Sequence, residues 1–300
     1  MLERNAKAAP VNGVAIDFGG TKISAARVND GFVGTSVRTR TDGNANVDDQ
    51  IDAMCDLLDQ LGLGSNEIVG IALAGRVSRD GEWFALNTET LTKVKAVPVR
   101  ALMSKRLARD VVVENDAIAA AIGEFVAGAG RGVRSMAFVT VSTGIGGGII
   151  LDGQPLISST GLAGHVGFTT SRIATDKCGS GRMQTVESIA SGRAIAALAA
   201  AAEHDQMDAR AVFAAHLSGE IWAGALIRQS ASAVAELCAN LKTTLDLDLV
   251  VLGGSIGLAD GYLDLVQGAL DDEPLIFRPA LAHAELGSDA ALLGVLVKPS

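Results

Sequence analysis

The first residues that could do chemistry form a glycine turn after a short apolar run. They are Asp17, Gly19, Gly20, Thr21 and Lys22. Glycines let backbone N–H groups approach phosphate oxygens, and the threonine adds a hydroxyl donor. A carboxylate at the end of a strand suits Mg²⁺, held directly or through water. An ordinary β-hairpin explains the same residues structurally, and this turn alone does not decide between the two readings.

A second glycine cluster lies near the middle of the chain, in residues 142–148. Ser142 and Thr143 precede glycines at positions 144, 146, 147 and 148. So many glycines carry a conformational entropy cost that a plain hairpin does not need. We therefore expect a phosphate or sugar edge to lie against this turn. The structural alternative is a flexible turn.

The pair Asn115 and Asp116 follows a short apolar run and precedes an alanine-rich segment. Both residue types are preferred helix caps, and for an isolated pair a cap is the simpler explanation. If the two turns bind a nucleotide, however, phosphoryl transfer still requires a carboxylate that positions and deprotonates the acceptor hydroxyl. Asp116 fits that role.

Alternating strands and helices must position these residues. The periodicity predicts strands over 14–18, 22–28, 32–39, 68–73, 111–113, 136–141, 148–151 and 249–252, and helices over 47–61, 102–107, 117–125, 188–202 and 221–245. Each half opens with a strand, a glycine turn and a second strand. We expect an α/β protein of two lobes with a ligand cleft between them, residues 1–118 with a C-terminal helix over 289–300 in one lobe and residues 119–288 in the other.

Composition narrows the class of protein. The 300 residues are 48% hydrophobic and only 4% aromatic, as in α/β proteins with buried parallel strands. A net charge of -9 argues against non-specific nucleic-acid binding. The odd, scattered cysteines Cys55, Cys178 and Cys238 favour a reducing compartment. Residues 1–10 precede no apolar segment of a signal peptide, and no apolar run reaches membrane length, so we expect a cytoplasmic protein without membrane partners.

At this point the order of motifs resembles the ROK family over nearly the whole chain. The matching segments are Asp17-x-Gly19-Gly20-Thr21-Lys22, Asn115-Asp116, residues 142–148, Gly161-Leu162-Ala163-Gly164-His165, residues 186–193 and Gly253-Gly254-Ser255. Three further stretches are similar to the branch of bacterial N-acetylmannosamine kinases: Arg79-Asp80-Gly81, Ala85-Leu86-Asn87 and residues 253–263.

The resemblance implies an actin-like ATPase (ribonuclease H-like) fold and transfer of the ATP γ-phosphate to a sugar 6-hydroxyl, in sialic acid and amino sugar catabolism. Asp116 would be the catalytic base, with ATP and Mg²⁺ as cofactors and a homodimer as the expected assembly. The residues implied on the ATP and phosphate side are Asp17, Gly19, Gly20, Thr21, Lys22, Thr143, Gly144 and Gly254. Those implied to bind the sugar are Asn87, Asn115, Asp116, His165 and Glu187.

Two departures from the family pattern bear on this reading. Many ROK proteins bind structural zinc through the histidine of the Gly-His motif and a Cys-x-Cys-Gly-x-x-Gly-Cys loop, but here Ser180 and Thr185 replace two thiolates. Only His165 and Cys178 remain as ligands, so we expect no structural zinc. His165 then serves the sugar or is a packed histidine. The second departure is Leu162, at a position where ROK glucokinases place a glutamate. The absence of that carboxylate should change the selectivity for sugar hydroxyls.

Three alternatives stay open. A ROK transcriptional regulator would need a helix-turn-helix module before Asp17, and the roughly sixteen preceding residues are too few for one. A ROK glucokinase or other hexose kinase would share the same motifs. A catalytically weak sugar-binding relative is motivated by the lost zinc ligands.

Overall fold

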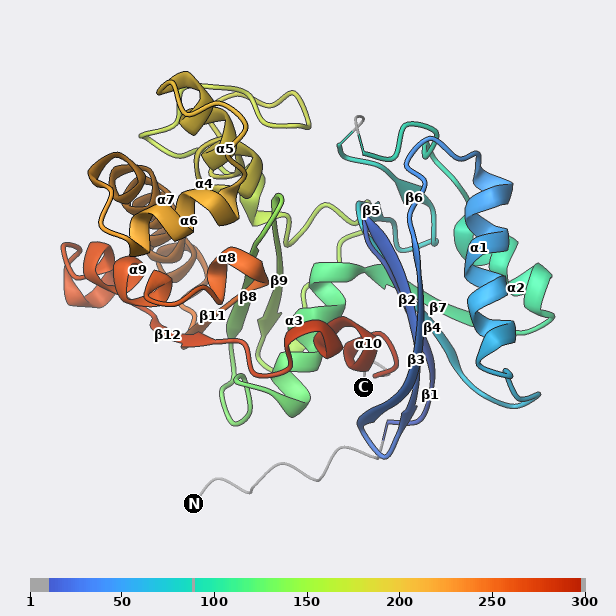
Figure 1. The fold of residues 1–300 in the computed structure, drawn as a ribbon. Helices are drawn as coiled ribbons and strands as arrows, with labels where there is room; N and C mark the ends of the chain where they lie inside the picture. Colours follow the sequence, from blue (N-terminus) through green and yellow to red (C-terminus); the bar gives the residue numbers. More distant parts are fainter. Residues whose placement is uncertain (1–10, 88–89, 298–300) are drawn as a thin grey trace, which may run out of the picture. The chain divides into compact units, whose positions relative to one another are not determined.

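The computed structural model describes residues 11–87 and 90–297 (Figure 1). Residues 1–10 and the last part of the helix expected over 289–300 lie outside the described residues. The chain forms two compact units, the first from Met1–Arg131, Ile157–Leu162 and Ser288–Ser300, and the second from Gly132–Leu156 and Ala163–Gly287. Each unit is built around its own five-stranded sheet.

The sheet of the first unit has the strand order β3-β2-β1-β4-β7. Its strands are β1 (Gly13–Phe18), β2 (Lys22–Asn29), β3 (Phe32–Arg40), β4 (Val69–Leu73) and β7 (Val111–Asn115), with a separate short hairpin of β5 (Arg76–Val77) and β6 (Trp83–Phe84). The strands β1, β2 and β3 are antiparallel, whereas β4 and β7 run parallel to β1. The carboxyl ends of β1, β4 and β7 therefore share one edge of the sheet.

Helices cover both faces of this sheet. The helices of the unit are α1 (Val47–Gln60), α2 (Val99–Leu107), α3 (Asp116–Ala127) and α10 (Ala290–Gly294). Apolar residues of α1 and α2, among them Met54 and Met103, share a core with Ile16 and Ile71 of the sheet. Because side chains alternate along a strand, Gly70 lies on the opposite face, where an added Cβ would lie 2.8 Å from a methyl group of Val295.

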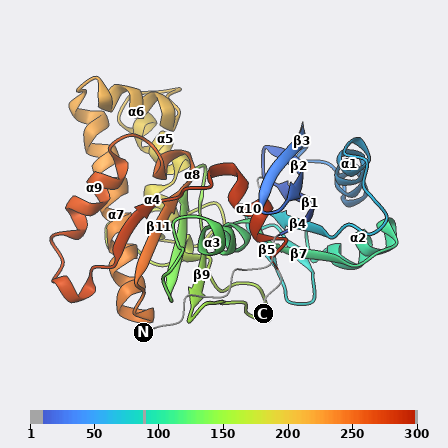
Figure 2. The same ribbon diagram turned by 90° about the horizontal axis from the view of Figure 1, so that it is seen from below.

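Two glycines bring α3 and α10 into close contact (Figures 1 and 2). A Cβ on Gly294 would lie 1.7 Å from the carbonyl oxygen of Ala119, and one on Gly123 would lie 2.2 Å from that of Ala290. Only residues without a side chain allow this approach. This packing places the whole of α3 in the first unit, which therefore extends past the boundary expected at residue 118.

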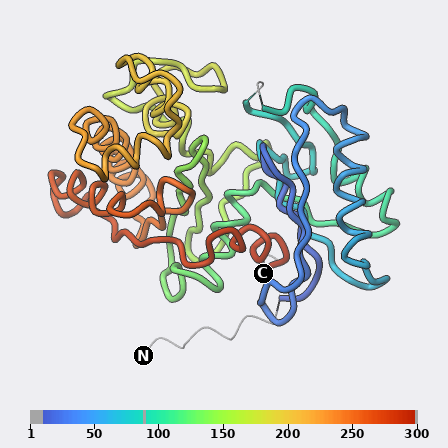
Figure 3. Tube along the Cα trace, in the orientation of Figure 1, coloured from blue at the N-terminus to red at the C-terminus, as the bar shows by residue number. Residues whose placement is uncertain are grey.

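The second unit repeats the topology of the first, with the strand order β10-β9-β8-β11-β12. Its strands are β8 (Met136–Val141), β9 (Ile145–Leu151), β10 (Gln154–Pro155), β11 (Leu249–Gly253) and β12 (Ala280–His283), of which β9 is antiparallel to β8, while β11 and β12 run parallel to β8. Its helices are α4 (Glu187–Ala190), α5 (Gly192–Ala201), α6 (Ala209–Leu217), α7 (Ile221–Leu245), α8 (Gly254–Gly257) and α9 (Tyr262–Leu270), with 3-10 turns at η1 (Val166–Phe168) and η2 (Leu275–Phe277). The long helix α7 lies beside α9 (Figure 3).

The helix expected over residues 188–202 is wrong in one respect, because it is broken at Ser191. This residue has extended backbone angles (φ -74°, ψ 160°), and its hydroxyl accepts a hydrogen bond from Ala194 N, which starts α5 afresh. Serine competes for backbone hydrogen bonds and so favours a cap over a helix interior. The break was not predicted because the many alanines of this segment favour a continuous helix.

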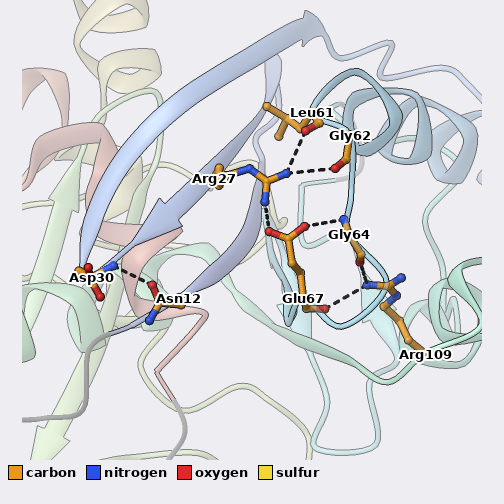
Figure 4. A network of polar contacts seen from close by, with 8 residues as sticks. All are labelled: Asn12, Arg27, Asp30, Leu61, Gly62, Gly64, Glu67 and Arg109. Carbon is orange, nitrogen blue, oxygen red and sulfur yellow. Dashed lines mark hydrogen bonds and ion pairs between the residues drawn. The ribbon is translucent and has the colours of Figure 1, made fainter.

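A polar network joins the C-terminal end of α1 to the first sheet (Figure 4). Arg27 on β2 donates to the carbonyl oxygens of Leu61 and Gly62 and forms an ion pair with Glu67. Arg109 donates to the carbonyl oxygens of Gly64 and Glu67 at 2.8 and 3.1 Å. Bonds from an arginine satisfy the carbonyls that a helix terminus leaves without intrahelical partners.

Among the described residues, no helix has the length and apolar character needed to cross a membrane. The three cysteines are free thiols and buried.

Candidate active site

The turn between β1 and β2 is closed by the chain itself and leaves its tip exposed. Gly19 N donates to Lys22 O at 2.9 Å, and the Thr41 hydroxyl donates to Gly19 O at 2.7 Å. Thr21 and Lys22 are exposed, so their side chains lie where a ligand could reach them. A Cβ on Gly20 would lie 2.7 Å from a methyl group of Thr90, so a larger residue there would require the Thr90 side chain to move.

Asp17 and Glu114 lie on one face of the first sheet. Asp17 of β1 is in register with Ala72 of β4, and Ala72 is in register with Glu114 of β7. Burial raises the pKa of Asp17 to about 6, although Lys22 opposes the shift. Burial likewise raises the pKa of Glu114 to about 7, partly offset by a hydrogen bond from Asn115 N and by Arg100. A partly desolvated carboxylate such as Asp17 gains most from a nearby cation.

Asn115 both caps α3 and orients Asp116. Its side-chain oxygen accepts a hydrogen bond from Ile118 N at 2.9 Å. Its amide nitrogen donates to Gly75 O at 2.7 Å and to Asp116 Oδ1 at 2.8 Å. A primary amide has two N–H donors, so both donors of Asn115 have protein partners. The helix-cap interpretation of Asn115 is therefore correct, and the cap coexists with a direct contact to Asp116.

The Asp116 carboxylate has two unlike oxygens. Oδ1 accepts from Asn115 Nδ2 and from Ala117 N, each at 2.8 Å. Burial, and next the negative charge of Asp17, raise the pKa of Asp116 to about 7, against the lowering effect of these hydrogen bonds. A carboxylate with a pKa near neutrality is a suitable general base at physiological pH.

In the second unit, the turn after β8 lies next to the end of β11. Ser142 N donates to Gly144 O at 3.0 Å, which closes the turn and leaves Thr143 exposed. The hydroxyls of Ser142 and Ser255 are 3.2 Å apart. Gly254 has φ 84°, and a Cβ there would lie 2.4 Å from Val141 O. Both the left-handed conformation and the close approach therefore require glycine at this position.

Neighbouring protein atoms leave no room for a side chain at two glycines of the 142–148 cluster. A Cβ on Gly144 would lie 2.7 Å from Glu187 Oε2, and one on Gly147 would lie 3.0 Å from Gly164 O and 2.6 Å from Val166. The segment that carries His165 packs directly on β9 at this point. Packing within the protein is therefore enough to require Gly147, whatever lies against the rest of the turn.

Glu187 contacts the same turn from α4. It is buried, and its Oε2 accepts a hydrogen bond from Ile145 N at 3.0 Å. Its Oε1 lies 3.8 Å from the guanidinium of Arg193, whose backbone N donates to Thr143 O. These contacts join α4, the start of α5 and the glycine turn.

The remaining expected sugar residues fall on loops. Asn87 lies after β6, is half-buried and accepts at its backbone oxygen from Thr90 N. His165 precedes η1, and its ring stacks on that of Phe168 with centroids 6.2 Å apart. Leu162 is 54% exposed. The structure thus groups Asp17, Asn115 and Asp116 in the first unit and Thr143, Gly144, Gly254 and Glu187 in the second.

Three charged residues at these sites were not predicted from the sequence as functional residues. Arg76 follows the glycine whose carbonyl accepts from Asn115, and its guanidinium lies 3.9 Å over the ring of Phe84. Glu114 and Arg193 are the other two. Glu114 lies directly before Asn115-Asp116 and Arg193 ends the matched segment 186–193, but a single sequence does not separate such residues from ordinary surface charges. Arg76 lies beside no recognised motif.

The donor set of the first unit fits Mg²⁺. Magnesium takes one or two carboxylates and retains several waters, and the Asp17 carboxylate beside an exposed glycine turn offers that chemistry. The raised pKa of Asp17 is the sign of a carboxylate that a cation would stabilise in its charged form.

The sequence and the fold of this chain are similar to those of known proteins. The model of the ROK family matches residues 13–297. The chain resembles an N-acetylmannosamine kinase from Citrobacter koseri, with 41% identity over 94% of this chain and 96% of that protein. Among solved structures it resembles a ROK hexokinase from Thermus thermophilus, with a TM-score of 0.81, 31% identity, and coverage of 96% of this chain and 97% of that one. A ROK family glucokinase from Streptomyces griseus, in complex with glucose and AMPPNP, gives a TM-score of 0.81 with 27% identity over 95% of this chain and 98% of that one.

The two αβ units with repeated topology and paired glycine turns are those of an actin-like ATPase fold, as the sequence predicted. This chain belongs to the ROK family.

Proposed function

We propose that this chain is an ATP-dependent kinase that phosphorylates the 6-hydroxyl of N-acetylmannosamine, in the breakdown of sialic acids and amino sugars. The observation that carries the proposal is the Asp116 carboxylate, held at Oδ1 by two donors and with its pKa raised to about 7. The 41% identity to an N-acetylmannosamine kinase supports the choice of sugar.

In the proposed reaction, the oxygen of the sugar 6-hydroxyl bonds to the γ-phosphorus of ATP while the bond from that phosphorus to the bridging β–γ oxygen breaks. ADP leaves, and the hydroxyl proton passes to Asp116 Oδ2. Asn115 holds Asp116 through Oδ1, so that Oδ2 is the oxygen presented to the substrate. Positioning and electrostatic stabilisation are the main contributions that a protein makes to phosphoryl transfer, and a carboxylate that orients the hydroxyl and accepts its proton contributes to the first.

The phosphate side would be supplied by Gly19, Gly20, Thr21 and Lys22, with Thr143, Gly144 and Gly254 on the nucleotide. Exposed donors at Thr21 and Thr143 support this assignment. Mg²⁺, held by Asp17, would neutralise charge on the phosphates. Zinc has no part in the proposed reaction.

The sugar would be bound by Asn87, His165 and Glu187, with Asn115 acting mainly on Asp116 because both of its N–H donors have protein partners. The apolar Leu162 is the residue that we expect to separate this specificity from that of glucokinases. A homodimer remains our prediction for the assembly, which sedimentation would test.

The proposal is tested by a coupled assay with ATP and Mg²⁺ on N-acetylmannosamine, N-acetylglucosamine, glucose and mannose. We expect the highest kcat/KM on N-acetylmannosamine, with the 6-phosphate identified by phosphorus NMR. A higher kcat/KM on glucose would assign the chain to the hexose kinases instead. No turnover on any of these sugars would leave a sugar-binding protein and refute the kinase.

A further inference from the structure

The loop that binds zinc in many ROK proteins has a different donor set here. The corresponding positions hold His165, Cys178, Ser180 and Thr185. Zinc in structural sites takes four nitrogen or thiolate ligands, and neutral hydroxyls are poor substitutes. Within residues 11–87 and 90–297, no group of three or more His, Cys, Asp or Glu side chains could hold a metal ion. The residues present therefore do not fit a structural zinc.

Hydrogen bonds close this loop instead. Cys178 N donates to Arg182 O at 2.9 Å, and Gly181 N donates to Cys178 O at 2.9 Å, so residues 178–182 form a tight hairpin tip. The thiol of Cys178 lies 3.1 Å from the hydroxyl of Ser180. The two side chains that would face a common metal are thus paired with each other.

The residue at the third thiolate position, Thr185, forms reciprocal hydrogen bonds with Ser188 at the start of α4. The Thr185 hydroxyl, in a fully buried residue, accepts from Ser188 N at 3.1 Å. In return the Ser188 hydroxyl donates to Thr185 O at 2.8 Å and lies 3.1 Å from Thr185 N. Reciprocal bonds of this kind satisfy the donors at the start of a helix and fix its direction.

Glu187 lies inside this capped turn. Its carboxylate accepts from Ile145 N at 3.0 Å and lies where a Cβ on Gly144 would clash. The bonded residues Thr185 and Ser188 therefore flank Glu187 in the sequence, and Glu187 contacts the glycine turn after β8. We propose that the reciprocal Thr185–Ser188 pair is a metal-independent positioning device, which holds Glu187 against the glycine turn after β8 in place of the zinc of related proteins.

A test of Thr185 uses nearly isosteric variants. Thr185→Val removes the hydroxyl while keeping the shape, and Thr185→Ser keeps the hydroxyl. We expect Thr185→Val to weaken binding of a non-hydrolysable ATP analogue by about tenfold, because a buried hydrogen bond at the start of α4 is lost, and Thr185→Ser to bind nearly as the parent does. Thr175→Val is the matched control, since the exposed Thr175 hydroxyl bonds only to the neighbouring Asp176 among the described contacts of the same loop.

Calorimetry gives the analogue affinity, and circular dichroism reports whether each variant folds. Should Thr185→Val fail to fold, Ser188→Ala removes the other half of the pair from a half-buried position and replaces it in the comparison. A folded Thr185→Val with parental analogue affinity would overturn the proposal, as would an equal loss in Thr175→Val.

A second experiment tests the role of zinc and does not depend on enzyme kinetics. We expect purified protein to hold far less than one zinc per chain and to keep its Tm and analogue affinity after treatment with 1,10-phenanthroline. Stoichiometric zinc whose removal lowers either quantity would overturn the proposal. The inference rests on the proposed function only in taking the turn after β8 as a nucleotide site. If the sugar assay fails while the analogue results hold, the proposed reaction is wrong and the positioning device stands.

Discussion

The Nδ2 of Asn115 donates a hydrogen bond to Asp116 Oδ1 over 2.8 Å, so one residue of the motif orients the carboxylate that we propose as the catalytic base. Asn115 ends β7 and caps α3, whereas Asp116 is the first residue of α3. The cap thereby fixes the backbone that carries the carboxylate. A structural and a chemical role are combined because the strand-to-helix junction places both side chains on the same turn.

Replacing Asp116 by Asn should remove most turnover and leave sugar binding nearly intact. The amide has almost the shape of the carboxylate but cannot accept the proton, and loss of a general base costs about 100- to 10,000-fold in rate. Steady-state kinetics and calorimetry with the sugar measure the two quantities. Asp110→Asn, at an exposed aspartate before β7, is the control. Turnover that survives in Asp116→Asn would mean that another group is the base.

The dependence of kcat/KM on pH should show an acid limb near pH 7. The base works only when it is ionised, and burial and Asp17 raise the pKa of Asp116 from its usual 3.8 to about 7. Activity is therefore lost as the pH falls through 7. An acid limb near pH 4 would contradict this explanation.

In Asn115→Ser the acid limb should move to higher pH. Serine can still cap α3 through Ile118 N, but the donor to Asp116 Oδ1 is lost, and a hydrogen bond to the charged form is what lowers a carboxylate pKa. A role confined to sugar binding would instead raise KM with an unchanged limb. The pH profile and the separate values of kcat and KM distinguish these two roles.

Gly144→Ala should weaken nucleotide binding by about tenfold, since overpacking costs about 1–3 kcal/mol. The added methyl would lie 2.7 Å from Glu187 Oε2 and must displace either that carboxylate or the turn. Titration with an ATP analogue measures the effect. Gly268→Ala, on α9 with no atom within 4 Å of the added carbon, should leave affinity unchanged. Equal behaviour of the two variants would show that the turn tolerates the displacement.

Gly294→Ala should destabilise the first unit by about 3 kcal/mol. The new methyl would lie 1.7 Å from Ala119 O and 2.6 Å from Gly123 N, which are both backbone atoms of α3 and cannot easily move away. Denaturant unfolding followed by circular dichroism reports the change. Gly34→Ala on β3, where the nearest atom would be 3.5 Å away, serves as the control and should be close to neutral.

Much of the fold could be read from local pattern. The bounds of β8 and of α7 agree with the periodicity of residues 136–141 and 221–245, because continuous burial or a long amphipathic face leaves a clear signal. The strands β5, β6, β10 and β12 were not predicted. Each has two to four residues, and pairing with a neighbouring strand, not local propensity, defines such elements.

The sequence by itself determined the motifs and their order, and from them the reaction class, since glycine turns and a carboxylate after a strand restrict the chemistry that is possible. Only the tertiary structure decided how these groups are used. It assigned both amide donors of Asn115, placed Glu187 against Ile145, and showed that the Thr185 hydroxyl accepts a hydrogen bond from Ser188 N at the start of α4. Two of these bonds, from Asn115 to Gly75 and from Ile145 to Glu187, join residues far apart in the sequence, and such contacts exist only once the chain has packed.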